Sequence, residues 1–216
     1  MIKKLAIFDF DGTLKDTPVE VPRDYLPRPG PDGTAEEMQM FRQRGVMWLN
    51  DPRSIDDPEG DYPWIEDVVQ AARDAYDEET TLSVLLTARS VNIEDAIRGA
   101  LDAKGVKFNR YIFSKSGLEK DPTTGRTAFF PPDVFKRTEV AKLIQQYPDV
   151  STVAVWEDSE KNLDAIENVV PPEIEYVRNL ETTRQSAISA RKNAHARATI
   201  SEESLMRSFI RGCLVR

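Results

Sequence analysis

The most informative segment of this chain is Leu5-Ala6-Ile7-Phe8-Asp9-Phe10-Asp11-Gly12-Thr13-Leu14. Its first four residues form a short apolar run, which predicts a buried strand. Asp9 and Asp11 follow where that strand ends, and Gly12 lets the chain turn. Because alternate residues of a strand share a face, we expect both carboxylates to project into one small space. Two close carboxylates repel unless a cation or a proton lies between them, so this pair favours a divalent metal and a phosphate ligand.

Further apolar runs predict an alternating pattern of strands and helices. The expected strands are residues 4–9, 82–87, 110–114, 152–157 and 174–178. Apolar residues at helical spacing lie between them, around residues 65–72, 93–101, 140–147 and 163–166. Such alternation predicts an α/β fold, a three-layer Rossmann-like parallel sheet of about five strands with helices on both faces. Ligands of such sheets bind beyond the carboxyl ends of the strands, where the two aspartates lie.

Two stretches depart from this alternation. Residues 15–63 hold eight prolines and many acids, and they predict a small irregular insertion after the first strand. We expect one helix at most within it, near 35–44, and an irregular flap around 48–54. Residues 114–132 contain Asp-Pro-Thr-Thr-Gly and predict a small hairpin. The expected organisation is therefore a domain over 1–180 that carries both insertions, followed by a basic helical extension over 181–216.

The charge of the chain is unevenly distributed. The net charge is −8, yet residues 182–216 hold seven basic and two acidic residues. The remainder carries 22 basic and 35 acidic residues, a surface that does not attract a long polyanion. A nucleic-acid ligand would need local contacts, which the basic extension can supply. Its last amphipathic segment, 205–210, is expected to dock on the core, with dimerisation or binding to a partner as the alternatives.

Composition restricts the environment of the protein. A single cysteine, Cys213, excludes an internal disulfide and fits a reducing compartment. No apolar run approaches the roughly 20 residues of a membrane helix, and the first strand begins at the N-terminus, so we expect no signal peptide. These features predict a cytoplasmic location and no membrane partner.

The DxDGT pattern at Asp9–Thr13 resembles the haloacid dehalogenase (HAD) superfamily of phosphotransferases. The resemblance implies that Asp9 is a nucleophile that forms an aspartyl phosphate. It implies that Asp11 is the general acid and base, which protonates the leaving group and then activates water. The branch of the superfamily that cleaves carbon–halogen bonds lacks the second aspartate, so Asp11 favours phosphoryl transfer.

The resemblance extends to the residues that would hold the phosphate. Thr87 matches the hydroxyl residue that ends the second strand, although a threonine there also serves as a helix N-cap. Arg89 either contacts a substrate phosphate or lies exposed. Lys136 is the best match for the lysine that neutralises phosphate charge, and Lys115 is its rival. Thr13 is expected among the substrate-binding residues.

A second acidic motif ends the strand expected at 152–157. Asp158 and Asn162 match the family's pattern of an acid followed four residues later by an acid or amide. Glu157 replaces the commoner glycine, and it either binds a metal through water or points away. The resemblance implies Mg²⁺, which prefers an all-oxygen site with few carboxylates. The expected ligands are the Asp9 carboxylate, the Asp11 backbone carbonyl and Asp158, with Glu157 and Asn162 in the surrounding shell.

A narrower likeness concerns the branch of the superfamily found in Swiss Army Knife RNA repair proteins. The residues that carry it are Trp48, Pro52-Arg53-Ser54, Leu85-Leu86-Thr87-Ala88-Arg89, Phe135-Lys136 and Trp156-Glu157-Asp158. Ser159 departs from that branch toward the general pattern. The branch implies an enzyme, a phosphatase, whose substrate is a nucleic-acid phosphate end such as a 3′-phosphate. A small phosphorylated metabolite is the other substrate class. A non-catalytic or regulatory binding module with the same fold, in a repair or metabolic assembly, is the alternative function.

Overall fold

The computed structural model describes residues 1–17, 21, 25, 29–30, 32–55, 62–115, 119–120, 127–128 and 131–181. The chain divides into residues 1–181, which form a compact unit, and residues 182–216. Residues 182–216 lie outside the described residues, as do the helices expected within them.

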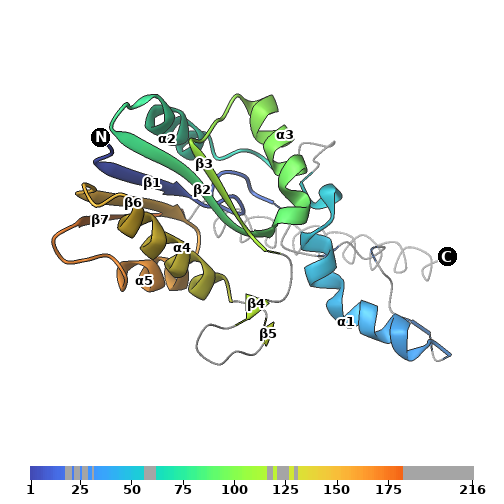
Figure 1. The fold of residues 1–216 in the computed structure, drawn as a ribbon. Helices are drawn as coiled ribbons and strands as arrows, with labels where there is room; N and C mark the ends of the chain where they lie inside the picture. Colours follow the sequence, from blue (N-terminus) through green and yellow to red (C-terminus); the bar gives the residue numbers. More distant parts are fainter. Residues whose placement is uncertain are drawn as a thin grey trace, which may run out of the picture. The chain divides into compact units, whose positions relative to one another are not determined.

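A five-stranded parallel sheet forms the centre of the first unit. Its strands lie in the order β3 (Arg110–Ser114), β2 (Thr81–Ser90), β1 (Lys4–Phe8), β6 (Thr152–Glu157) and β7 (Glu175–Leu180). The chain winds outward from β1 in both directions, so β2 and β6 both pair with β1 (Figure 1). The topology therefore switches at β1, where a doubly wound sheet opens a crevice beyond its strand ends. The predicted α/β fold is confirmed.

Helices cover both faces of the sheet. Figure 1 shows α2 (Glu66–Asp77) and α3 (Glu94–Lys104) on one side of it, and α4 (Pro132–Gln146) and α5 (Glu160–Glu167) on the other. Alternate residues of β1 serve the two layers: Ala6 and Phe8 pack against α2 and α3, whereas Leu5 and Ile7 pack against α4 and α5. Because both faces are buried, β1 and β6 are apolar along most of their length, at residues 5–8 and 153–156, as is common for parallel strands.

The insertion after β1 contains more helix than the sequence indicated. Helix α1 (Ala35–Leu49) begins at a capping box of Thr34 and Glu37 and continues past residue 44, and a 3₁₀ helix follows at Pro52–Ser54. The expectation of an irregular flap around 48–54 was therefore wrong. Between Thr34 and Asp51 the chain has no proline to break the helix, and Asp51 caps the 3₁₀ turn by accepting a hydrogen bond from the Arg53 N–H. Most other positions from 18 to 31, together with 56–61, lie outside the described residues.

The second insertion holds a two-stranded antiparallel sheet. Strand β4 (Glu119–Lys120) pairs with β5 (Thr127–Ala128), within the range where the sequence predicts a hairpin. No helix among the described residues combines the length and the apolar character that crossing a membrane requires.

Candidate active site

The two aspartates of the first motif lie just beyond the end of β1. The Asp9 N–H donates to the Trp156 carbonyl oxygen at 3.0 Å, which extends the pairing of β1 with β6. Gly12 then takes a φ of 70°, a left-handed conformation that favours glycine, and its N–H donates to the Lys15 carbonyl oxygen. The two carboxylates on the strand side of this turn contact different neighbours.

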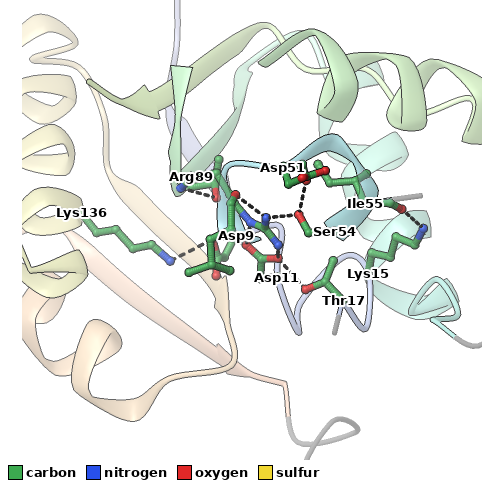
Figure 2. Close-up of polar contacts among 11 residues, drawn as sticks. Asp9, Asp11, Lys15, Thr17, Asp51, Ser54, Ile55, Arg89 and Lys136 are labelled. Atoms are coloured by element: carbon green, nitrogen blue, oxygen red, sulfur yellow. Dashed lines mark hydrogen bonds and ion pairs between the residues drawn. The ribbon is translucent and has the colours of Figure 1, made fainter. Parts of the chain in front are cut away.

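Asp9 lies in a buried cluster built from β1, β6 and α4. The Lys136 ammonium lies 2.9 Å from Asp9 Oδ1 and 2.6 Å from Glu157 Oε2. Asn162 Nδ2 donates to the other Glu157 oxygen at 3.0 Å. Figure 2 shows the Lys136 side chain reaching from its helix toward Asp9. Of the two candidate lysines, Lys136 contacts the first aspartate, whereas Lys115 lies at the exposed end of β3.

The electrostatics of this cluster are unbalanced toward negative charge. Burial raises the pKa of Asp9 well above its usual value near 3.8, and the charge of Glu157 raises it further, against the opposing effect of Lys136. Burial alone would lower the pKa of Lys136, but the charges of Asp9 and Glu157 outweigh burial and raise it. One lysine thus compensates two buried carboxylates, and a further cation would complete the neutralisation.

The donor set suits a small, hard cation. Among the described residues, carboxylate oxygens of Asp9, Glu157 and Asp158 lie within 4.8 Å of one another. Oxygen-only donors with few carboxylates are the ligands that Mg²⁺ takes. The Glu157 side chain points into this cluster. Its two oxygens also accept hydrogen bonds from Lys136 and Asn162. These residues fit a magnesium ion.

Asp11 has a different set of partners. Arg89, at the end of β2, donates from Nε to Asp11 Oδ2 at 2.9 Å and from Nη2 to Asp11 Oδ1 at 2.6 Å. The Thr17 hydroxyl also donates to Asp11 Oδ1. The other terminal nitrogen of Arg89 donates to the Leu49 carbonyl oxygen and to Ser54 Oγ, each at 2.6 Å (Figure 2). Arg89 therefore joins Asp11 to the insertion.

The two threonines named from the motifs are buried at the same end of the sheet. Thr87 Oγ1 accepts a hydrogen bond from the Arg89 N–H at 3.2 Å, within the last residues of β2. Thr13 is fully buried, and its hydroxyl has no hydrogen-bond partner within the described part of the chain. No motif pointed to Thr17, and Ser54 was named only as part of the pattern for the RNA repair branch. The contact between Ser54 and Arg89 has no local signature, because the two residues are 35 positions apart.

Comparisons with known proteins identify the family to which this chain belongs. A family model described as HAD domain family 1 in Swiss Army Knife RNA repair proteins matches residues 35–212. The protein YMR265C of Saccharomyces cerevisiae, described as uncharacterized, is 24% identical over 182 residues, which make up 77% of this chain and 37% of that protein. The chain thus spans little more than a third of this relative.

Two solved structures resemble the fold at low sequence identity. The HAD domain of the Legionella pneumophila effector Lem4 is 14% identical with a TM-score of 0.47, covering 83% of this chain and 86% of that one. A chain in the Pnkp1/Rnl/Hen1 complex is 13% identical with a TM-score of 0.44, covering 83% and 47%. The family model spans most of the sequence, from the insertion through the second acidic motif. The chain belongs to HAD domain family 1 of Swiss Army Knife RNA repair proteins.

Proposed function

We propose that this chain is a Mg²⁺-dependent phosphohydrolase that works through an aspartyl-phosphate intermediate. The observation that carries the proposal is the buried Lys136 ammonium between Asp9 and Glu157, beside the acidic cluster with Asp158. A buried lysine held against one aspartate lowers the repulsion that an anionic phosphate would meet there. A DxDG turn with a purely structural role would not require a buried lysine between two carboxylates.

In the proposed reaction, an Asp9 oxygen attacks phosphorus and the bond to the leaving oxygen breaks. Asp11 gives its proton to that oxygen, then takes a proton from the water that hydrolyses the aspartyl phosphate. Asp9, Asp158 and the Asp11 carbonyl would hold Mg²⁺, with Glu157 and Asn162 around them. The metal would supply positive charge to the phosphoryl oxygens.

Family membership supports a nucleic-acid phosphate end as the substrate, with a 3′-phosphate as the first choice. The seven basic and two acidic residues of 182–216 suit contact with a polynucleotide. Thr13, Thr87 and Lys115 are the residues that we propose to contact the substrate, because they lie at or near the carboxyl edge of the sheet.

The test is phosphate release by the purified chain with Mg²⁺ or with EDTA. The substrates are RNA and DNA oligonucleotides with 3′- or 5′-phosphates, nucleotides, sugar phosphates and an aryl phosphate. Asp9→Asn should lower the rate by at least about 10³-fold, since it removes the nucleophile. Asp77→Asn, an exposed aspartate at the end of α2, is the matched control and should keep the wild-type rate.

Release that requires both Mg²⁺ and Asp9, with preference for 3′-ends, would support the repair substrate. A preference for a small phosphate ester would move the proposal to the metabolite class. A folded protein that releases phosphate from none of these substrates would favour the binding-module alternative.

A further inference from the structure

Arg89 links the proposed acid/base residue to the insertion that follows β1. Its side chain is only 2% exposed, and it makes four hydrogen bonds: two to Asp11, one to the Leu49 carbonyl oxygen and one to Ser54 Oγ. These bonds use most of the donors of a guanidinium group. The Arg89 guanidinium therefore donates both to Asp11 and to the insertion.

The segment of the insertion that accepts these hydrogen bonds is itself packed against the rest of the protein. We call residues 48–55, the end of α1 and the following 3₁₀ turn, the flap hinge. Within it Trp48, Ser54 and Ile55 are buried. The Ser54 hydroxyl donates to the Asp51 carbonyl oxygen at 2.7 Å, and the Lys15 ammonium donates to the Ile55 carbonyl oxygen at 2.7 Å. The flap hinge therefore presents its acceptors to Arg89 from a packed position.

The fork geometry fixes the direction of the Asp11 carboxylate. Two parallel N–H donors orient a carboxylate plane in a way that a single contact does not. The Thr17 hydroxyl adds a donor to the oxygen that Arg89 Nη2 already contacts. A general acid must meet the leaving oxygen at hydrogen-bond distance, so its orientation decides how well it transfers a proton.

We propose that Arg89 is a positioning residue that couples the seating of the flap hinge to the orientation of Asp11. The inference rests on the proposed phosphohydrolase, in which Asp11 protonates the leaving group. With the flap hinge seated, Leu49 and Ser54 hold the guanidinium, and the guanidinium holds the carboxylate. When the hinge moves away, Arg89 loses both acceptors and Asp11 loses its fixed direction.

Leaving-group dependence separates this role from direct phosphate binding. Phenyl phosphate needs a proton on its departing oxygen, whereas the departing group of 2,4-dinitrophenyl phosphate needs none. A residue that positions Asp11 therefore affects kcat/KM for the first ester much more than for the second. A residue that binds the phosphate affects both alike, because the phosphate is common to them.

We expect Arg89→Ala to lower kcat/KM for phenyl phosphate by about 10²–10³-fold, and for the dinitrophenyl ester by less than about 10-fold. Arg89→Lys should recover little of this loss, since an ammonium cannot form the fork. Ser54→Ala removes one of the two flap-hinge acceptors of Arg89, together with the hydroxyl's bond to the Asp51 carbonyl oxygen, and should show the same selectivity with a loss of about 3–10-fold. Ser83→Ala is the control, because that buried serine lies at the other end of β2 and bonds Asn109.

Hydrogen–deuterium exchange gives a readout that does not depend on turnover. Arg89→Ala, Arg89→Lys and Ser54→Ala should speed exchange in residues 47–55 relative to α2, whereas Ser83→Ala should not. Equal losses on both esters would overturn the proposal in favour of phosphate binding. Unchanged exchange and selectivity in Ser54→Ala would overturn the coupling. If the wild type hydrolyses neither ester, exchange alone decides whether Arg89 holds the flap hinge, and phosphate release from the oligonucleotides decides the phosphohydrolase proposal separately.

Discussion

The two aspartates of the first motif are two residues apart, yet each is held by a different part of the molecule. Asp9 pairs with Lys136, and Glu157 and Asn162 complete its surroundings, so its cluster belongs to the packed sheet and helices. Asp11 pairs with Arg89, whose remaining contacts are to the insertion. One carboxylate is therefore fixed by the core, and the other depends on where the flap hinge lies.

The contrast suggests a division of labour in the proposed reaction. The nucleophile needs a constant, charge-balanced setting, because an anion must approach it. The proposed acid/base residue is connected through Arg89 to the insertion, so its direction can change with the flap hinge. Variants of Lys136, Asp9 and Asp158 affect the first side, and variants of Arg89 affect the second.

The largest effect on stability should come from replacing Lys136, which contacts both Asp9 and Glu157. Lys136→Met leaves the buried carboxylates of Asp9 and Glu157 without their shared cation, which should cost about 3–5 kcal/mol in EDTA. Urea unfolding measures this free energy. Adding Glu157→Gln to Lys136→Met should restore part of the loss, since one buried charge is removed.

Lys161→Met provides the control for this variant. Lys161 also forms an ion pair, with Asp133 at 3.1 Å, but its side chain is 74% exposed. Exposed pairs contribute about 0–1 kcal/mol. If both methionine variants lost the same small amount, Lys136 would not be compensating the acidic cluster.

The raised pKa of Asp9 predicts a pH dependence of stability without metal. In the unfolded chain Asp9 loses its proton near 3.8, whereas the folded protein retains it to higher pH. The folded state then binds more protons than the unfolded state, so the contribution of Asp9 to stability falls as pH rises above about 4. The slope is at most about 1.4 kcal/mol per pH unit from this one group.

Asp9→Asn removes this titration and should flatten the stability curve, leaving the variant more stable than wild type at pH 7 in EDTA. Urea midpoints between pH 4 and pH 7 measure the difference. Parallel curves for the two proteins would show that Asp9 ionises as easily in the folded chain as in the unfolded one.

Magnesium should reverse that loss of stability. At a Mg²⁺ concentration about 100 times its dissociation constant, the folded state should gain about 2.7 kcal/mol, seen as a higher Tm. Asp158→Asn should abolish this rise in Tm, because Asp158 forms the acidic cluster together with Asp9 and Glu157. Arg89→Ala should keep most of the rise in Tm, since Arg89 contacts the Asp11 side chain and not the carboxylates of the acidic cluster. A full Mg²⁺ shift in Asp158→Asn would place the ion elsewhere.

The strands and core were predictable because their signal is local. Residues 110–114 and 152–157 form strands with the predicted bounds, since each has a short apolar centre, at residues 111–113 and 153–156, that packs in the sheet. Strand β2 continues past Thr87 to Ser90, where its pairing with β3 becomes irregular. That extension carries Arg89 toward Asp11, and no pattern of apolar residues indicates it.

The site was predictable by position but not by partner. Motif spacing put Asp9, Asp11 and Asp158 at neighbouring strand ends, because parallel strands share a carboxyl edge. The pairing of basic with acidic side chains depends on tertiary contacts, which motif spacing does not give. Arg89 and Asp11, for example, are 78 residues apart in the sequence. Glu157 shows the same limit, since its contact with Lys136 joins two elements 21 residues apart.

The smallest effect should come from a second arginine fork on the flap hinge. Arg53 contacts both Asp51 oxygens, at 3.0 and 2.7 Å, much as Arg89 contacts Asp11, and it lowers the pKa of Asp51. Its side chain, however, is 68% exposed, so water replaces the contact cheaply. Arg53→Ala should change the free energy of unfolding by less than about 0.5 kcal/mol and leave kcat/KM for both esters within about twofold. If Arg53→Ala instead produced the leaving-group selectivity expected of Arg89→Ala, the flap hinge as a whole, and not the buried fork, would orient Asp11.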